Sequence, residues 1–396
     1  MSIMRILARA MFDGEAAHLD GPYLVTAEQG VITSVEKVPG VAEAEINADF
    51  VMPGLVEAHA HIFLDGSLLD MDERAAYLKA YFRRMMATAR ANVEKCTMAG
   101  VTLVRDAGDR YGVNHAIRDW LAADPAAPMG LRSPGLALKR PKRYGAFMGR
   151  DIESAAEIPQ AVHELSQSSD DIKILLTGII DFRAAEVKGD PQFDAEELRL
   201  VVAEAHAHHR KTFAHCSGLA GLEVAVEAGG DSVEHGFFMT RDILARMAEK
   251  GIAWVPTVSP VHFQWLLPSL AGWDAKTVEN LRRILDSHAE HIAIAHELGV
   301  NLVAGSDAGS QGVDHGTALV DELFHFLDAG LPMEAVLASA TSRPRRLWGA
   351  PSANIAAGNR LDLIALGGSP FEDREALRRV RHVVRGEAWL QMPVPA

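Results

Sequence analysis

Cysteine is nearly absent from this sequence. Only Cys96 and Cys216 occur among 396 residues, which is too few for a disulfide framework in so long a chain. We therefore expect a reducing compartment, the cytoplasm, where disulfides are rare. The first thirteen residues also lack the apolar stretch and small-residue cleavage site of a secretory signal.

Positive charge and long apolar runs are also scarce. Lysine and arginine number 39 against 53 acidic residues, and the formal net charge is −14. Such a chain repels nucleic-acid phosphates and has little attraction for anionic lipids. No apolar run reaches the roughly 18 residues of a membrane span. These absences exclude nucleic acid and membrane as expected partners. They leave a small-molecule substrate, with a homo-oligomer as a common arrangement.

Apolar residues are plentiful, at 48% of the chain. Eight short apolar segments read as strands: 51–59, 102–106, 130–133, 171–177, 211–215, 232–235, 253–257 and 301–305. Helical patterns lie between most of them, including 73–99, 152–166, 195–209, 219–227, 241–250, 274–298 and 317–329. This alternation predicts an α/β fold, a (β/α)8 barrel of the TIM type. A doubly wound open sheet is the alternative, weakened because no Gly-x-Gly-x-x-Gly follows an early strand.

Both chain ends read as short strands separated by turns. The pieces 3–8, 23–27 and 31–38 open the chain, and 362–366, 380–385 and 387–390 close it. Terminal segments often lie close together. We therefore predict a small β-sandwich module made of residues 1–52 and 355–396, and a barrel domain made of residues 53–354.

Histidine is abundant, with 17 copies, and several stand at the ends of predicted strands. In a barrel these ends share one face, where active sites form. His59 and His61 are two apart, so both point to the same side of a strand and could bind one ion through nitrogen. His215 and His235 end the fifth and sixth predicted strands. Each histidine alone is better explained as a packing residue, but together they indicate a metal site.

Two other ionisable residues occupy comparable positions. Lys173 lies between Ile172 and Ile174, so its side chain should face the barrel interior. A buried ammonium is costly unless paired, so either its tip reaches the surface or the lysine is converted to an anionic carbamate. Asp307 stands between two glycines after the eighth strand. It is either a turn residue or a metal ligand that takes a proton from bound water.

Five segments, four of which carry these residues, resemble motifs of the amidohydrolase superfamily, and the resemblance covers nearly the whole chain. They are VMPGLVEAHAH at 51–61, IKILLTG at 172–178, SVEHG at 232–236, GSDAG at 305–309 and GNRLDLI at 358–364. The segment around Lys173 is similar to the prolidase-like and imidazolonepropionase-like branch, in which a carboxylated lysine bridges two metals. The sequence departs from the usual motif at Cys216, which follows His215.

The resemblance implies a binuclear metal-dependent hydrolase that acts on carbon–nitrogen bonds. His59, His61 and Asp307 would hold one divalent ion, His215 and His235 the other, and Lys173, as a carbon dioxide carbamate, would bridge both. Zinc is the default metal. A bridging hydroxide would attack an amide-type bond in a dipeptide, N-acyl amino acid or cyclic amide, and Asp307 would pass the proton to the leaving nitrogen.

Other functions stay open. The same site could hydrolyse lactones or phosphotriesters. A mononuclear deaminase is disfavoured because deaminases of this superfamily lack the lysine of the fourth strand. A non-catalytic scaffold is disfavoured because all six ligand positions are filled.

Substrate contacts should come from the loops that follow the strands. The basic segment 139–145 contains Arg143 and Tyr144 and could clamp a carboxylate, although such charge runs are usually solvated loops. Arg105, His262 and His315 also follow or end predicted strands. Each is a weaker candidate for binding the substrate.

Overall fold

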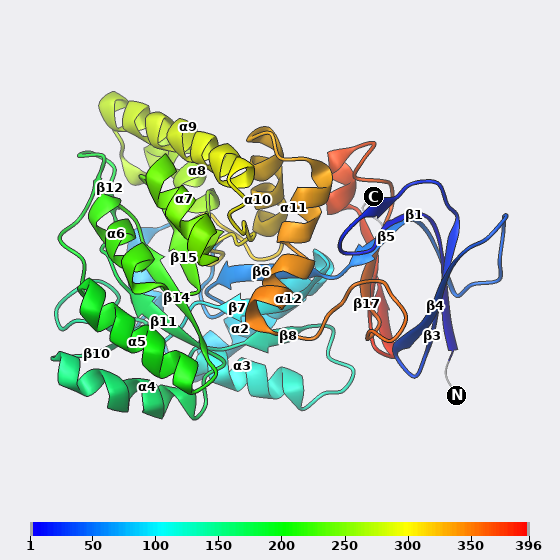
Figure 1. Ribbon diagram of the computed structural model, residues 1–396, viewed down its shortest axis with the longest axis horizontal. Coiled ribbons are helices and arrows are strands. Elements are labelled where there is room, and N and C mark those ends of the chain that lie inside the picture. The colour runs from blue at the N-terminus through cyan, green and yellow to red at the C-terminus, as the bar shows by residue number, and fades with distance from the viewer. Residues whose placement is uncertain (1–2, 394–396) are drawn as a thin grey trace.

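The computed structural model of the protein describes residues 3–393, which form an α/β body with a smaller β module at one end (Figure 1). The module has the strands β1 (Ile3–Phe12), β2 (Ala17–His18), β3 (Tyr23–Glu28), β4 (Val31–Lys37), β5 (Ile46–Pro53), β17 (Asp362–Leu366), β18 (Val380–Arg385) and β19 (Ala388–Gln391). Their order is β19-β18-β17-β5-β1-β3-β4, with β2 beside β1.

The two chain ends meet at β5, which runs parallel to β1 and antiparallel to β17. Buried apolar residues of both halves, such as Ile6 and Val25 on one side and Leu363 and Val384 on the other, share one cluster. The predicted pairing of the two ends is therefore present, in one mixed sheet.

The body contains parallel strands in two sheets. One is β6 (Leu55–Ala60), β7 (Val101–Asp106) and β8 (Gly130–Arg132). The other has the order β10 (Gly149–Asp151), β9 (Ala137–Lys139), β11 (Asp171–Leu175), β14 (Lys211–Cys216), β15 (Ser232–His235) and β16 (Ala253–Val255). A short hairpin, β12 (Ile180–Asp181) and β13 (Glu186–Val187), follows β11. The predicted α/β class with parallel strands is thus confirmed.

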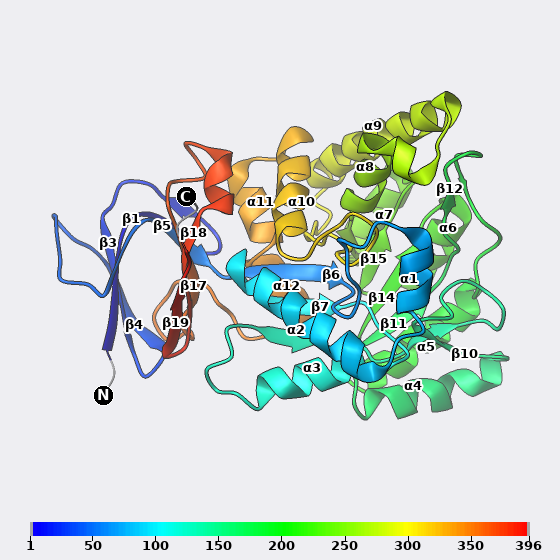
Figure 2. The ribbon, with the colours of Figure 1, turned by 180° about the vertical axis from the view of Figure 1, so that it is seen from behind.

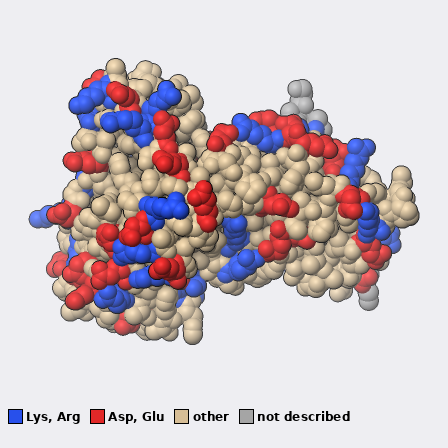
Figure 3. All heavy atoms as spheres, turned by 45° about the horizontal axis from the view of Figure 1, so that its top comes forward, with Lys and Arg blue, Asp and Glu red and all other residues tan. Residues whose placement is uncertain are grey.

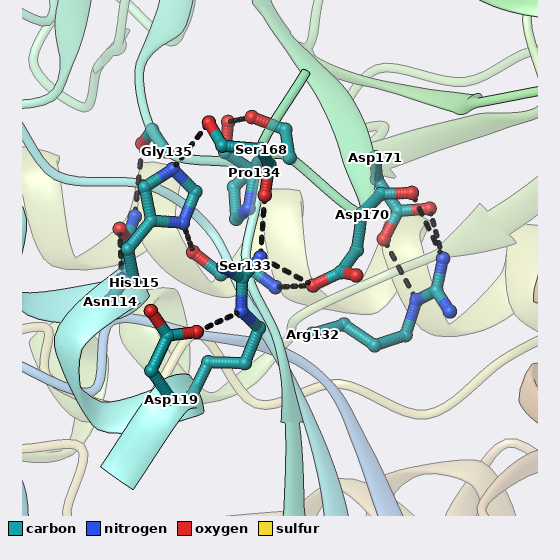
Figure 4. Close-up of polar contacts among 12 residues, drawn as sticks. Asn114, His115, Asp119, Arg132, Ser133, Pro134, Gly135, Ser168, Asp170 and Asp171 are labelled. Carbon is teal, nitrogen blue, oxygen red and sulfur yellow. Dashed lines mark hydrogen bonds and ion pairs between the residues drawn. The ribbon is translucent and has the colours of Figure 1, made fainter. Parts of the chain in front are cut away.

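Polar contacts join β8 to β11 (Figure 4). The backbone N–H of Asp170 donates to the carbonyl of Ser133 at 2.9 Å, and its carboxylate accepts from the N–H of Ser133 at 2.8 Å. Arg132 donates two hydrogen bonds, of 2.9 and 2.8 Å, to the fully buried carboxylate of Asp171. Such a bidentate ion pair fixes both the spacing and the angle between the two segments.

The eighth predicted strand, 301–305, is only an isolated bridge between Leu302 and Trp254. Ala304 accepts a hydrogen bond of 3.1 Å from the N–H of Ala58 in β6. Its own N–H donates to Ser339 instead of to a neighbouring strand, at 2.9 Å. A regular ladder is therefore interrupted, although the segment still lies between β16 and β6.

Twelve α-helices occur in the described residues: α1 (Met71–Tyr77), α2 (Phe82–Met98), α3 (Val113–Ala122), α4 (Ile158–Ser166), α5 (Ala195–Ala207), α6 (Leu219–Ala228), α7 (Arg241–Lys250), α8 (Ser259–Leu266), α9 (Ala275–Glu297), α10 (Thr317–Asp328), α11 (Met333–Ser339) and α12 (Ser342–Trp348). Short 3-10 helices cover Ala155–Glu157, Pro268–Ala271 and Arg374–Arg378. Several boundaries follow from caps, because Asp194 and Asp274 accept backbone N–H groups at the starts of α5 and α9.

The predicted helix 73–99 is wrong as one element, because the chain turns between α1 and α2. Three hydrogen bonds of 2.7–3.0 Å run from the Arg74 guanidinium to the carbonyls of Asp65, Leu68 and Gly309. The hydroxyl of Tyr77 donates to the carbonyl of Phe63. These long-range contacts hold α1 over the end of β6, so helix propensity alone does not decide its length.

Strand β6 points away from the β module. Its arrow runs from the module in both views (Figures 1 and 2), and towards α1 in Figure 2. On the face shown in Figure 3, acidic and basic side chains are interspersed. No helix among the described residues is both long enough and apolar enough to cross a membrane.

Candidate metal centre

Six ionisable side chains from five separate segments converge on one cavity of about 260 Å³. His59 and His61 come from the end of β6, Lys173 from β11, His215 from β14, His235 from β15, and Asp307 from the segment after 301–305. The strands β11, β14 and β15 run parallel in one sheet, so residues distant in sequence meet near the carboxyl ends of these strands.

His59, His61 and Asp307 form the tightest group. The Nε2 atoms of the two histidines lie 3.7 and 3.5 Å from the same oxygen, Oδ1 of Asp307. One possible ligand atom from each of the three residues lies within 4.8 Å of the others. Two imidazole nitrogens and a carboxylate oxygen at this spacing could surround a single divalent ion.

A second pair of imidazoles adjoins the first group. The ring centroids of His215 and His235 are 4.5 Å apart, and those of His59 and His235 are 4.9 Å apart. Lys173 is 1% exposed, and its Nζ has no hydrogen-bond partner among the described residues. It lies 4.7 Å from the centre of the Phe213 ring. The amine therefore stands buried and unpaired beside the imidazoles.

Neighbouring groups orient the histidine rings. The Nδ1 of His59 lies 2.6 Å from a carboxylate oxygen of Glu234, and that of His235 lies 2.7 Å from the hydroxyl of Thr257. A hydrogen bond at one ring nitrogen fixes the tautomer and directs the other nitrogen. In both rings the Nε2 atom is thereby left for the cavity.

Burial controls the charge of these groups. It lowers the pKa of His61 and His215 to about 3, and it also lowers the pKa of His59 and His235. All four imidazoles are therefore neutral near pH 7, which is the form that binds a metal. Burial likewise lowers the pKa of Lys173 to about 8, so a fraction of its amine is uncharged and nucleophilic.

The backbone at three neighbouring strand ends is strained. His235, Thr257 and Asp307 have φ angles of 70°, 47° and 55°. This left-handed region is uncommon for residues other than glycine, and unfavourable above all for β-branched threonine. Strain of this kind clusters at functional sites, where surrounding contacts impose it.

A second cavity, of about 330 Å³, adjoins the first. The two share the lining residues Tyr144, His215, His235, Asp307, Ser310 and Gln311. Its outer wall is apolar and includes Ile179, Ile180, Phe182, Phe237 and Val261. A molecule with one polar bond at the histidine cluster could thus extend an apolar group into the second cavity.

Comparisons with known proteins identify the family of this chain. A model of the amidohydrolase family matches residues 50–387. The chain belongs to the amidohydrolase family. As a member it is a hydrolase that acts on carbon–nitrogen bonds, and the resemblance drawn from its motifs is confirmed.

Several relatives support this assignment. An uncharacterised protein of Mycobacterium tuberculosis is 29% identical over 322 residues, covering 80% of this chain and 79% of its own. Ochratoxinase of Aspergillus niger is 28% identical over 366 residues, covering 85% and 74%. The crystal structure of a Xaa-Pro dipeptidase with bound methionine superposes with a TM-score of 0.84 at 24% identity, covering 98% of this chain and 100% of the other. The last likeness shows a shared fold.

Only one of the five predicted substrate contacts lines the site of this amidohydrolase. Tyr144 borders both cavities, with its ring 5.0 Å from that of His215. Arg143 is exposed and donates to the carbonyl of Asp190. Two more basic residues of this loop are also engaged, since Lys139 pairs with Asp151 and Arg140 with Glu197. The predicted carboxylate clamp is therefore not assembled in this structure.

The other three candidates lie away from the cavity lining. Arg105 is 1% exposed and donates to Glu234 and to the carbonyl of Ala58. His315 is buried, with its Nε2 3.2 Å from the carbonyl of His61. His262 lines a separate cavity beside His325. A position near the end of a predicted strand did not indicate which way each side chain turns.

Sequence reasoning missed several residues of the site. Glu234 and Thr257 orient histidines, while Arg74, Gln264 and Gln311 line the cavities. A signal existed for Glu234, because it stands directly before His235 in the motif SVEHG. The glutamines carried no signal, since they belong to helix α8 and to the loop after Asp307.

Proposed function

We propose that the protein is a binuclear metal-dependent hydrolase that cleaves an amide-type carbon–nitrogen bond in a small molecule. One observation carries the proposal: six ligand-type side chains converge on one cavity, and four of them are imidazoles that burial keeps neutral. Packing alone gives no reason to gather so many polar groups away from water.

The donor set fits two divalent ions, for which zinc is the default. His59, His61 and Asp307 would hold one ion, and His215 and His235 the other. Lys173 would bridge them as a carbamate, formed when its Nζ bonds to the carbon of carbon dioxide and releases a proton. The buried and unpartnered Nζ supports this role, because the carbamate would replace a stranded ammonium by an anion facing two cations.

The chain's own residues would bind and orient the substrate and move a proton. When bound, the ions would polarise the scissile carbonyl and lower the pKa of water. Asp307 lies beside the Nε2 atoms of His59 and His61, where it would accept a proton from water and then give it to the leaving nitrogen. The apolar wall of the second cavity would keep water from one side of the substrate.

The finer points of architecture are also proposals. We propose that the contacts of 301–305 with β16 and β6, and those of Ser133 with Asp170, complete a (β/α)8 barrel over residues 53–354. Residues 1–52 and 355–396 would form the small β-sandwich module. We also keep as proposals a cytoplasmic location and a homo-oligomeric state.

A substrate panel tests the function. Protein loaded with zinc or manganese should hydrolyse members of a panel of dipeptides, N-acyl amino acids and cyclic amides, with release of the amine measured by mass spectrometry. Asp307→Asn should lower kcat/KM at least about 100-fold. Asp321→Asn, at a surface pair with Arg378, is the control and should keep activity. Protein that holds two metals per chain and cleaves no amide of the panel would refute the proposal.

A further inference from the structure

A directed chain of hydrogen bonds passes through two residues that line the second cavity, Gln264 and Gln311. The indole Nε1 of Trp273 donates to Oε1 of Gln264 at 2.9 Å. The Nε2 of Gln264 then donates to Oε1 of Gln311 at 3.0 Å, and the Nε2 of Gln311 donates to the carbonyl of Leu69 at 2.5 Å. The chain connects α8 with the loop after Asp307 and with the segment before α1.

The two ends of this chain fix the direction of both amides. An indole N–H can only donate and a backbone carbonyl can only accept. Neither glutamine can therefore be flipped without losing a bond at an end. Each amide group carries two N–H bonds and uses one in the chain. Gln264 and Gln311 are thus each left with one N–H donor, held in place beside the cavity that both line.

Both glutamines line the cavity into which a substrate bound at the histidine cluster would extend. Gln311 lines both the cavity of the histidine cluster and the apolar cavity. No lysine or arginine lines the apolar cavity among the described residues, and Lys139 and Arg140 of the basic loop pair with Asp151 and Glu197. Besides its imidazoles, the side-chain donors that line the apolar cavity are therefore uncharged: the amides of Gln264 and Gln311 and the hydroxyls of Tyr144, Ser217, Thr257 and Ser310.

The absence of lysine and arginine from the described residues of this lining determines which chemical group Gln264 and Gln311 would bind. A carboxylate placed among Ile180, Phe182, Phe237 and Val261 would lose its hydration without a cation to replace it. A ketone, ester or amide carbonyl needs only one or two N–H donors. The cavity is thus suited to an apolar group that carries a neutral carbonyl oxygen.

We propose that Gln264 and Gln311 determine specificity by binding a neutral carbonyl oxygen on the bulky apolar part of the substrate. The preferred substrates are then amides in which one side of the scissile bond bears an aromatic or cyclic group with such a carbonyl. The inference rests on the proposed amide hydrolysis and adds which substrates the site selects.

Matched substrates test this inference. N-(acetylbenzoyl)- and N-(ethylbenzoyl)-amino acids differ by one carbonyl oxygen at nearly constant size, and meta and para isomers vary its position. Amides of acetyl- and ethylbenzylamine place the same groups on the amine side. The metal-loaded wild type should favour the acetyl member of at least one pair about tenfold in kcat/KM, the value of one hydrogen bond of about 1.4 kcal/mol.

The variants Gln264→Met and Gln311→Met keep the side-chain length and remove the donors. In each single variant the ratio of the two kcat/KM values should fall below that of the wild type, and in the double variant it should fall to about one, whatever happens to each rate separately. Gln160→Met, on the exposed face of α4, is the matched control and should keep the wild-type ratio. If the two glutamines had a merely structural role, the variants would lower both rates and leave the ratio unchanged, and this result would overturn the inference. A wild type that does not prefer the acetyl member of any pair would also overturn it.

Binding of the products separates this inference from the proposed function. Calorimetry should show that the wild type binds acetylbenzoate, or acetylbenzylamine, more tightly than its ethyl analogue, and that Gln311→Met reduces the difference. If no amide is hydrolysed but this difference is present, the proposed reaction fails and the recognition stands. If amides are hydrolysed and the difference is absent, the recognition fails and the reaction stands.

Discussion

Replacing Glu234 by glutamine should weaken both folding and metal binding. The carboxylate of Glu234 is fully buried and serves three donors: the Nη2 of Arg105 at 2.9 Å, the hydroxyl of Ser232 at 2.6 Å, and the Nδ1 of His59 at 2.6 Å. Glutamine keeps the shape but removes the charge and replaces one acceptor by a donor. Arg105, which is 1% exposed, would then be a buried cation without its counter-ion.

The size of the effect follows from this burial. Removing one partner of a buried ion pair costs about 3–5 kcal/mol. Arg105 keeps its hydrogen bond of 2.8 Å to the carbonyl of Ala58, so we expect the lower end, about 3 kcal/mol, in the free energy of unfolding of the metal-free protein. Metal affinity should fall about 10- to 100-fold, because His59 loses the acceptor that orients its ring.

Urea unfolding of metal-free protein and competition with a chelator dye measure the two effects. Glu227→Gln is the control, because its pair with Arg199 is half exposed and should contribute less than about 1 kcal/mol. In the double variant Arg105→Met, Glu234→Gln, the loss of stability should be smaller than the sum of the two single losses. An unchanged urea midpoint for Glu234→Gln would refute the reasoning.

Three further predictions address other parts of the chain. Thr257→Val removes the hydroxyl beside His235 and should weaken metal binding about tenfold, as measured by chelator competition; unchanged affinity would contradict the role of Thr257. Burial raises the pKa of Glu322 to about 8, whereas its ordinary value is 4.5. Between about pH 5 and 8 the folded protein thus keeps a proton on Glu322 that the unfolded chain has lost. The free energy of unfolding should therefore fall as the pH rises through this range. In urea titrations at several pH values, Glu322→Gln should not show this fall in the free energy of unfolding. A pH dependence parallel to that of the wild type would contradict the role of Glu322. Arg132→Met leaves the buried Asp171 carboxylate unpaired and should cost about 3 kcal/mol. The exposed-pair variant Arg150→Met should unfold near the wild-type urea concentration, and equal midpoints for all three proteins would count against the contact between β8 and β11.

The convergence of the ligand-type residues could be predicted from the sequence, since it depends on topology. His59, His215 and His235 each end a parallel strand, and such ends share one face of an α/β fold. The inward direction of Lys173 followed from alternation along its strand. Their assignment as metal ligands is still a prediction that metal analysis must test.

Contacts between distant segments could not be predicted in the same way. Arg143 was expected at the substrate, but a backbone acceptor at Asp190 turns it outwards. The break between α1 and α2 depends on carbonyls that Arg74 meets only in the folded chain. The hydrogen bond between Gln264 and Gln311 likewise joins residues 47 positions apart, and no periodicity in the sequence predicts it.

Elemental metal analysis of wild type and Lys173→Ala tests the binuclear site most directly. Protein purified after growth with added zinc or manganese should hold about two metal ions per chain. Lys173→Ala should hold one or fewer, because it lacks the bridging group. The same metal content in both proteins would contradict the bridge, and a wild type without bound metal would contradict the metal centre itself.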